Sequence, residues 1–419
     1  MTVAASVPAV GELPLRGLRE RSYLSGTFAE LCRIESPSGR ERECAERVIA
    51  ELRALGIDVH EDDAGPRAGS NCGNLLARIP GGPGSAGGAA IAGGAEDTGA
   101  APGAERARPS LLLCAHLDTV PALAPIEPVL VDGFWENAND GILGADNKAA
   151  VAVLLALARH VHRHGAPVDV ELLFTVGEEV SLAGSRAFDA SVLRSRHGFV
   201  FDHATPIGEV VVDSPTHFRV EASFRGAAAH AGVRPEQGRS AIVAAARAIA
   251  SLPHGRLEDS STVNVGMING GSAINVVPEH CTLTMEARAF GDERAETLVA
   301  EIVDRIHEAA NLEDCDCDVD VSVQRTFSGF HLTASNPTVA LAEAALRACG
   351  HEPVHISSGG ASDANELLLR GVQTVNLANG TERNHEPGER VSVLALEQML
   401  EVALALVDGA GSLPAGAAL

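Results

Sequence analysis

Residues 111–118 read Leu-Leu-Leu-Cys-Ala-His-Leu-Asp, an apolar run that ends in a histidine and an aspartate. Two further apolar runs follow at 168–176 and 198–201, and a long helical pattern from about 147 to 164 separates the first run from the second. Strand, helix and strand at this spacing are typical of a parallel sheet whose faces are covered by helices. The stretch therefore predicts an α/β fold with a mostly parallel sheet flanked by helices.

The sequence pattern changes between residues 213 and 330. Amphipathic strand and helix patterns alternate there, the strands at 217–224, 262–268, 280–289 and 318–325 and the helices at 240–251 and 294–310. This combination predicts an inserted α+β domain.

The first pattern then resumes, with a helix at about 337–349, a strand at 372–377 and a final helix at about 392–408. We therefore expect the first domain to be split into residues 1–212 and 331–419, around an inserted domain at 213–330.

Two segments are expected to lack packed structure. Residues 1–20 resemble a loosely held tail. Residues 81–110 are almost entirely Gly, Ala, Pro and Glu, and such a segment cannot bury enough apolar surface to offset the entropy lost on ordering. We expect a mobile surface loop there.

The charge balance of the chain excludes several classes of partner. Its 419 residues carry 32 Lys and Arg against 56 Asp and Glu, a net charge of -24. An acidic excess repels phosphate backbones and anionic lipid surfaces, and no apolar run reaches the roughly 20 residues of a membrane span. We expect neither a nucleic-acid nor a membrane partner. The eight cysteines show no disulfide framework, which favours a reducing cytoplasm.

Acidic and imidazole side chains follow the predicted strand ends. His116 and Asp118 follow the first apolar run, Glu178 and Glu179 follow the second, and Asp202 follows the third. Because the carboxyl ends of parallel strands meet at one edge of a sheet, we expect these side chains to share a cleft.

Two more groups belong with this set. Asp146 precedes the long helix, where a carboxylate favours the positive end of the helix dipole, and His385 lies downstream of the strand that ends near 377. Taken singly, such residues are usually caps or solvated groups. Taken together, the carboxylates would repel one another strongly unless cations neutralised them, and His, Asp and Glu are ligands for zinc-like ions.

The number of ligands favours a pair of ions. Five plausible ligands exceed the four that a single tetrahedral zinc takes, so two ions that share one carboxylate fit better than one.

Short motifs along the chain carry a family resemblance. They are His116-Leu117-Asp118-Thr119-Val120, Leu143-Gly144-Ala145-Asp146-Asn147-Lys148, Gly177-Glu178-Glu179, Ala229-His230-Ala231-Gly232, Ala273-Ile274-Asn275-Val276-Val277-Pro278 and Gly359-Gly360-Ala361-Ser362-Asp363-Ala364-Asn365. From about Phe28 onward the chain resembles the co-catalytic zinc metallopeptidases that include peptidase T, glutamate carboxypeptidase, aminoacylase and succinyl-diaminopimelate desuccinylase. The second and last motifs look most like peptidase T and its relatives.

The resemblance implies a ligand set for two divalent ions, most simply zinc, with cobalt or manganese as alternatives. It implies that Asp146 bridges the ions, that His116 and Asp202 complete one of them, and that Glu179 and His385 complete the other. It also implies a cis peptide bond between Asp146 and Asn147.

Two more carboxylates are expected to act beside the ions. Asp118 lies two residues beyond His116, on the same strand face and about 6.6 Å further along, where it can orient that histidine. Glu178 is the implied general base, and we expect its neighbour Glu179 to point to the opposite side of the chain.

The inserted domain supplies further candidates by resemblance. His230 looks like an oxyanion donor that relatives supply across a dimer interface, which implies a homodimer through a lid or dimerisation domain; a turn histidine is the alternative. Asn275 and Arg288 resemble substrate-binding residues, although Arg288 could be a solvated strand residue. Gly359 and Gly360 would bring backbone close to substrate, or form a plain turn.

Lys148, the sole lysine of the chain, lies in the first turn of the predicted helix. A cation there is disfavoured by the helix dipole, so it either pairs with site carboxylates or occurs by chance.

The function expected from these features is metal-dependent hydrolysis of short peptides, as in a tripeptidase or aminopeptidase. The alternative is an N-acyl-amino-acid amidohydrolase with the same chemistry. By resemblance, Asp at position 202 favours the peptidase, because acylases of the family tend to carry Glu there. A non-catalytic binding protein on the same fold would need a ligand or Glu178 replaced, and none is.

Overall fold

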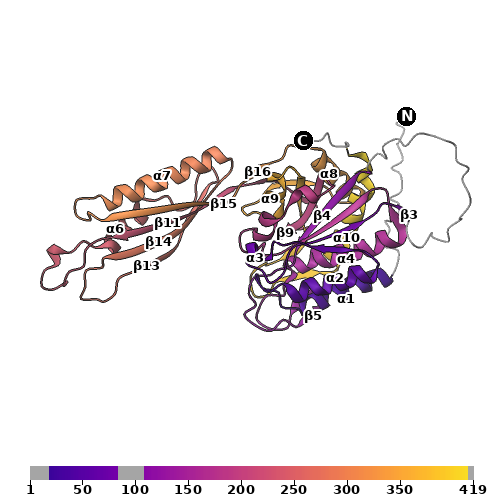
Figure 1. Cartoon of the computed structure of the whole chain (residues 1–419), viewed down its shortest axis with the longest axis horizontal. Helices are drawn as coiled ribbons and strands as arrows, with labels where there is room; N and C mark the ends of the chain where they lie inside the picture. Colours follow the sequence, from indigo (N-terminus) through magenta and orange to yellow (C-terminus); the bar gives the residue numbers. More distant parts are fainter. Residues whose placement is uncertain (1–17, 84–107, 414–419) are drawn as a thin grey trace, which may run out of the picture. The chain divides into compact units, whose positions relative to one another are not determined.

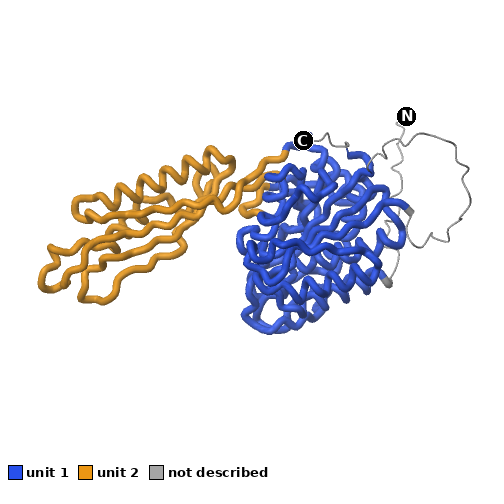
Figure 2. Tube along the Cα trace, in the orientation of Figure 1, with its two compact units in different colours: residues 1–211, 333–356, 362–419 blue, residues 212–332, 357–361 orange. Residues whose placement is uncertain are grey.

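The computed structural model describes residues 18–83 and 108–413. The chain forms two compact units (Figure 2): unit 1 takes in Met1–Val211, Thr333–Ile356 and Ser362–Leu419, and unit 2 takes in Val212–Leu332 and Ser357–Ala361. The boundaries predicted from the sequence place all of 331–419 in the first domain. In the structure, Ser357–Ala361 belongs to unit 2 instead.

Most of the two segments expected to lack packed structure lies outside the described residues. Residues 1–17 of the tail and 84–107 of the loop belong to this undescribed part. The described ends of both segments are structured, because helix α1 (Leu18–Cys32) starts within the expected tail and strand β4 starts at Ser110.

The large sheet of unit 1, flanked by helices, confirms the predicted α/β class (Figure 1). Its strands run in the order β1-β2-β8-β4-β9-β18-β10, and β16 (Phe330–His331) pairs with Asp213 and Ser214 at the end of β10. They are β1 (Val59–Glu61), β2 (Leu75–Ile79), β8 (Asp169–Thr175), β4 (Ser110–His116), β9 (His197–His203), β18 (Gln373–Ala378) and β10 (Glu209–Ser214), with β17 (Val354–Ser357) also paired to β10. The central strands β8, β4, β9 and β18 are parallel, and antiparallel strands flank them on both sides.

The central strands are buried on both faces, which explains their continuous apolar sequences. Leu112, Leu173 and Val200 pack on one face against Leu367 of helix α9 (Asp363–Leu369). The residues that alternate with them face the other way and are also buried, on the side where α4 (Ala145–His164) contacts β4 and β9.

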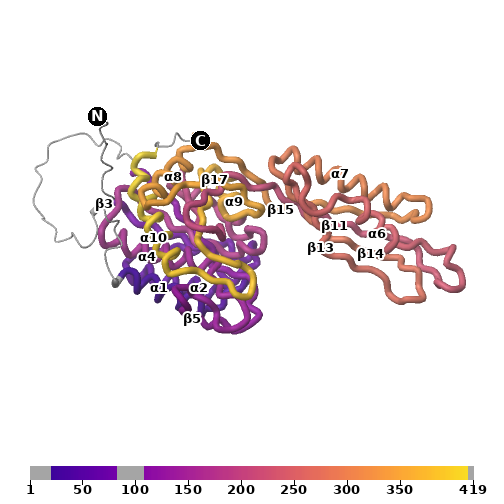
Figure 3. Tube along the Cα trace, turned by 180° about the vertical axis from the view of Figure 1, so that it is seen from behind, coloured from indigo at the N-terminus to yellow at the C-terminus, as the bar shows by residue number. Residues whose placement is uncertain are grey.

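Helix α4 is buried along most of its length because other helices cover it. Helices α1 and α10 pack against α4, and Figure 3 shows the three close together. The helices of unit 1 are α1, α2 (Arg42–Ala54), α3 (Gly65–Ala68), α4, α5 (Ala183–Ala187), α8 (Pro337–Ala348), α9 and α10 (Val393–Gly409), with 3-10 turns η2 (Ala190–Val192) and η4 (Ala410–Ser412).

Small sheets complete unit 1. One has the order β19-β20-β6-β5 and the other joins β3 to β7. Their strands are β19 (Thr381–Glu382), β20 (Arg390–Ser392), β6 (Phe134–Asn137), β5 (Pro128–Val131), β3 (Gly82–Pro83) and β7 (Gly165–Ala166).

Unit 2 is an antiparallel sheet with two helices on one face. The sheet has the order β12-β13-β14-β11-β15. The helices and strands of unit 2 are β11 (Thr216–Arg225), η3 (Pro235–Gln237), α6 (Ala241–Ser251), β12 (Gly255–Arg256), β13 (Thr262–Gly270), β14 (His280–Ala289), α7 (Asp292–Ala310), β15 (Asp318–Phe327) and β16 (Phe330–His331). Alternate residues of β14, such as Leu283 and Met285, pack against Ala245 of α6 and Ile302 of α7.

Among the described residues, no helix combines the length and the apolar character needed to cross a bilayer.

Candidate metal centre

Adjacent parallel strands bring the first group of candidate ligands together. Strand β4 ends at His116, and its neighbour β9 carries Asp202 near its carboxyl end. His116 Nε2 lies 3.2 Å from Asp146 Oδ1 and 3.5 Å from Asp202 Oδ1. One ligand atom from each of the three residues lies within 4.8 Å of the others.

A second group meets the other side of Asp146. His385 Nε2 lies 2.8 Å from Glu179 Oε1 and 3.2 Å from Asp146 Oδ2. The two oxygens of Asp146 therefore face two different histidine–carboxylate pairs. All five residues predicted as ligands are brought together in unit 1.

The donor set fits divalent cations. Imidazole nitrogens and carboxylate oxygens are the ligands that zinc-like ions take, and no basic side chain other than the two histidines is within ion-pairing distance of these carboxylates among the described residues.

Burial and mutual repulsion shift the protonation of the site. Burial, opposed by His116 and supported by the charge of Asp146, raises the pKa of Asp202 to about 8. Hydrogen bonds to Asp146 and Glu179 raise the pKa of His385 to about 10. Burial lowers the pKa of His116, but the carboxylates around it outweigh this effect and hold the pKa well above its usual value. The raised pKa values of both histidines reflect an excess of negative charge, which bound cations would neutralise.

Asp118 contacts both the His116 ring and the backbone of Glu178 and Glu179. Its carbonyl oxygen lies 2.9 Å from His116 Nδ1, and its carboxylate accepts the backbone N–H groups of Glu178 at 3.0 Å and Glu179 at 3.1 Å. Ser38 Oγ donates to the same carboxylate at 2.7 Å. Because β4 ends at His116, the predicted strand spacing does not apply, and Asp118 contacts the histidine from the irregular segment that follows the strand.

Glu178 and Glu179 do not point to opposite sides. They lie in a turn after β8 rather than in a strand, so strand alternation does not separate them, and one oxygen of each lies within 4.8 Å of the other and of a His116 nitrogen. Burial raises the pKa of Glu178 well above its usual value, and the charge of Asp202 raises it further.

Glu389 is a site residue that the sequence did not indicate. Its buried carboxylate accepts the backbone N–H groups of Leu143 at 2.8 Å, Gly144 at 2.7 Å and Asp146 at 2.8 Å. Burial raises its pKa to about 7. Asn384 Nδ2 donates to Asp146 Oδ2 at 2.8 Å. Together these contacts fix the turn that presents Asp146.

The start of helix α4 contains the expected backbone feature. The peptide bond between Asp146 and Asn147 is cis. Lys148 is fully buried, and its Nζ donates to the carbonyl of Ile34. Of the two alternatives for Lys148, pairing with site carboxylates is not found among the described residues, where its ammonium group donates to a backbone carbonyl.

In unit 2, His230 and Asn275 lie on neighbouring segments. The backbone N–H of Ala231 donates to the Asn275 carbonyl at 3.0 Å, and both side chains are exposed. His230 Nδ1 accepts the backbone N–H of Gly232 at 3.2 Å.

Arg288 is held within unit 2 by other residues. Its guanidinium donates to both oxygens of Glu286, at 3.2 and 3.0 Å, and to the Gly359 carbonyl at 2.9 Å. Arg288 and Gly359 also line a cavity of about 510 Å³. A Cβ atom at Gly359 would meet nothing within 4 Å, and one at Gly360 would meet only Ser358 Oγ at 4.0 Å, so packing does not require glycine at either position.

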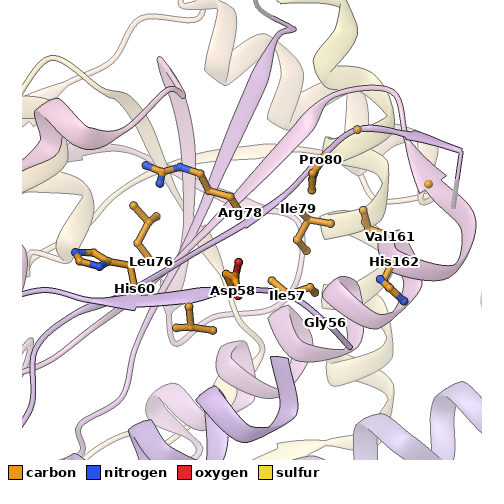
Figure 4. Close-up of a pocket in the computed structure, with 13 residues that line it drawn as sticks. Gly56, Ile57, Asp58, His60, Leu76, Arg78, Ile79, Pro80, Val161 and His162 are labelled. Atoms are coloured by element: carbon orange, nitrogen blue, oxygen red, sulfur yellow. The ribbon is translucent and has the colours of Figure 1, made fainter. Parts of the chain in front are cut away.

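A larger cavity of about 730 Å³ lies elsewhere in unit 1 (Figure 4). Asp58, His60, Arg78 and His162 are among its lining residues, and none of the candidate metal ligands is. Arg78 is already engaged, because it donates to Glu171 at 2.8 Å and to the Val192 carbonyl at 2.6 Å. This cavity is therefore separate from the candidate metal centre.

Two family descriptions match the chain. Residues 216–313 match a peptidase dimerisation domain, and residues 98–231 match peptidase family M28. The uncharacterized protein YqjE of Bacillus subtilis is 31% identical over 387 residues, which cover 91% of this chain and 97% of that protein. An acetylornithine deacetylase of Myxococcus xanthus is 29% identical over 390 residues, covering 88% and 93%.

Solved structures resemble the chain over almost its whole length. Aminopeptidase PepT from Bacillus cereus superposes with a TM-score of 0.80 at 32% identity, covering 93% of this chain and 98% of that one. A tripeptidase from Staphylococcus aureus gives a TM-score of 0.82 at 28% identity, with the same coverage. Near-complete coverage at this identity means that the chain belongs to the peptidase T-like family of metallopeptidases, metal-dependent hydrolases of peptide bonds.

Proposed function

We propose that this protein is a peptidase that hydrolyses short peptides, with tripeptides as the first class to test, and that two zinc ions serve the reaction. The observation that carries the proposal is the position of Asp146. Each of its oxygens lies 3.2 Å from the Nε2 atom of a different histidine, His116 or His385, and each histidine has a further carboxylate partner.

The ligand roles follow from these contacts. When two ions are present, Asp146 would contribute to both of them, His116 and Asp202 would hold one, and Glu179 and His385 would hold the other. When such ions are bound, they add Lewis-acid chemistry that polarises a carbonyl and makes water easier to deprotonate.

Glu178 is the general base of the proposed reaction. It lies beside His116 without serving as one of the five ligands. Burial holds its pKa well above that of an ordinary glutamate, which suits a group that takes a proton from water and returns it to the leaving amine near neutral pH. Asp118 and Glu389 are positioning residues, since they hold the backbone that carries Glu178 and Asp146.

His230 is proposed to donate a hydrogen bond to the developing oxyanion. Its Nδ1 accepts a backbone N–H, so the neutral ring carries its proton on Nε2 and can donate it. The match of residues 216–313 to a peptidase dimerisation domain supports a homodimer through unit 2, in which His230 serves the site of the partner chain.

Asn275, Arg288, Gly359 and Gly360 are proposed to bind substrate. Arg288 offers a planar fork to a carboxylate, and it already binds one on Glu286 at 3.0 Å. A substrate carboxylate would compete with or extend that pair.

Deacylation of N-acyl amino acids is the second candidate activity. The similarity to an acetylornithine deacetylase over 93% of that protein favours it, whereas the Asp at position 202 favours the peptidase by resemblance.

A substrate panel tests the proposal. The purified protein is stripped with a chelator, reloaded with zinc, cobalt or manganese, and assayed on tripeptides, dipeptides, N-acyl amino acids and glutamyl conjugates. We expect tripeptide cleavage that requires metal, with Glu178→Gln inactive and the exposed Glu127→Gln active as its matched control. Cleavage of N-acyl amino acids alone would make the protein a deacylase, and no cleavage of any class would contradict both activities.

A further inference from the structure

A second cluster of metal-ligating side chains lies at the far end of helix α4. His160 and His164 lie near the carboxyl end of α4, and Glu20 lies in the first turn of α1. One nitrogen of each imidazole and one oxygen of Glu20 all lie within 4.8 Å of one another. The two rings lie with centroids 4.5 Å apart. None of the three residues contributes to the candidate catalytic centre.

Helix geometry builds this cluster. Residues four apart on a helix lie on the same face, one turn apart, so the two histidines form a clamp for one ion. The register between the two helices is fixed close by, because the Arg159 guanidinium lies 4.5 Å from the ring centre of Tyr23. Arg159 is next to His160, and Tyr23 lies about one turn after Glu20. Their contact therefore keeps the Glu20 carboxylate close to the two histidines.

The local charges favour a cation. Glu20 is half-buried, and Asp408 of α10 acts on His160 through its charge. Within residues 18–83 and 108–413, no hydrogen bond or ion pair engages the His160 ring, the His164 ring or the Glu20 carboxylate, so their ligand atoms are available. Burial lowers the pKa of His160, and the neighbouring His164 lowers it further. A lowered pKa favours neutral imidazole, the form that binds metal.

We propose that Glu20, His160 and His164 bind a further divalent ion of the zinc class, at a site separate from the catalytic centre. Ligand atoms around tetrahedral zinc lie roughly 3.3 Å apart, so closure from the observed separations needs only side-chain rotation, which the exposed His164 permits. The helix from Asp146 to His160 spans roughly 20 Å at about 1.5 Å per residue, which excludes a shared ion.

The bound ion joins the first described helix to the longest helix of unit 1. Helices α1 and α4 are far apart in sequence, so an ion held by both of them binds the folded chain and not the unfolded one. Mass action then stabilises the folded state as the zinc concentration rises. With three protein ligands, a fourth position remains for water or for the nearby Asp408.

The test compares tag-free wild-type protein with His160→Gln/His164→Gln, with Glu20→Gln and with a control, His162→Gln. His162 lies on α4 between the two histidines but lines the cavity of Figure 4. Each protein is stripped with a chelator and dialysed against buffers of fixed zinc concentration. Bound zinc per chain is measured by elemental analysis, and the unfolding temperature is measured with and without zinc.

We expect the wild type and His162→Gln to bind one more zinc per chain than the double variant. We expect Glu20→Gln to weaken that zinc by at least the tenfold seen for loss of an outer-shell partner. The zinc-dependent rise in unfolding temperature should be smaller in the double variant. Because the catalytic ligands are the same in every protein compared, the difference in zinc content does not depend on peptidase activity.

Equal zinc content in the wild type and the double variant would overturn the proposal. So would loss of the additional zinc in His162→Gln, which would indicate unspecific binding to surface histidines. If the double variant fails to fold in chelator, His164→Gln decides, because this exposed side chain can change without loss of packing; wild-type zinc affinity in His164→Gln would overturn the proposal.

Discussion

The candidate residues of unit 1 and unit 2 are held in different ways. In unit 1, His116 and Asp118 are almost completely buried, and backbone N–H groups point at the carboxylates of Asp118 and Glu389. In unit 2, His230 and Asn275 are exposed. Unit 1 therefore fixes its candidate ligands by burial and hydrogen bonds, whereas unit 2 presents its candidate side chains on an exposed surface.

Electrostatics explains why the two regions differ. Buried carboxylates are stable only when cations or hydrogen bonds compensate them, so the site of unit 1 needs its geometry fixed before the ions arrive. His230 and Asn275 of unit 2 are exposed to water, so no buried charge requires their geometry to be fixed in advance. The following predictions test this contrast, starting with the largest expected effect.

Removing the proposed general base should have the largest effect. Glu178→Gln should lower turnover by at least the roughly 100-fold typical of lost general-base catalysis, while both ions remain bound, because amide for carboxylate removes the proton acceptor and leaves the ligands in place. Turnover and metal content per chain are measured on the same preparation. Glu179→Gln is the comparison, and it should lose metal. Metal loss in Glu178→Gln instead would show that the two roles are exchanged.

Removing the exposed histidine of unit 2 should have a large effect that a second chain can rescue. His230→Ala should lower turnover by roughly 100-fold to 1000-fold, as for loss of an oxyanion donor. Mixing it with Glu178→Gln should restore part of the activity, because each mixed dimer then has one site with both lesions and one with neither.

The exposed His280→Ala, in the same unit, is the control and should keep its activity. Absence of recovery after verified subunit exchange would place His230 in the site of its own chain or outside catalysis.

Weakening the backbone support of unit 1 should have an intermediate effect. Glu389→Gln replaces an acceptor for three backbone N–H groups with a weaker one, so Asp146 is held less firmly. Metal affinity should fall by roughly 10-fold to 100-fold, as for other outer-shell partners. Competition with a chelator measures this affinity. Glu386→Gln changes an exposed glutamate three residues away and should leave it unaltered; equal affinity in both variants would remove Glu389 from the site.

The contrast between the units also explains what the sequence could predict. His116 and Asp202 end apolar runs, and parallel strands bring such ends together, so strand patterns alone placed them in one cleft. Glu389 follows Glu386-Pro387-Gly388, where no periodic pattern marks it. Its role arises only when the chain folds back and its carboxylate meets the turn at 143–146.

Local patterns were least informative where packing between helices decides the structure. The sequence pattern predicts a tail up to residue 20 and no helix over 18–32, where Gly26 and several polar residues weaken the helical pattern. Leu24, Phe28 and Leu31 of α1 are nonetheless buried, and α1 packs on α4. The prediction that Glu178 and Glu179 point to opposite sides was wrong for a similar reason. It assumed a strand, but β8 ends at Thr175 and the two glutamates lie in the turn that follows.

The smallest predicted effect concerns the ion pair that holds Arg288 in unit 2. Hydrogen bonding from His217, opposed by burial and supported by Arg288, lowers the pKa of Glu286 to about 2. A lowered carboxyl pKa stabilises the fold above the pKa of the unfolded chain, about 4.3, and this stabilisation is lost as pH falls toward 2. The side chain is 36% exposed, so solvent screening reduces the contribution to about 1 kcal/mol.

Glu286→Gln should therefore lower the free energy of unfolding by about 1 kcal/mol at pH 7 and by about half as much at pH 3, measured by denaturant titration at both values. Glu221→Gln removes a more exposed ion pair with Arg219 on the neighbouring strand, and its effect should stay within about 0.5 kcal/mol at either pH. An effect of Glu286→Gln that is the same at pH 3 and pH 7 would mean that the charge of Glu286 does not stabilise unit 2. Arg288 would then be held by its bond to the Gly359 carbonyl, and its guanidinium would be more accessible to a substrate carboxylate than the present geometry indicates.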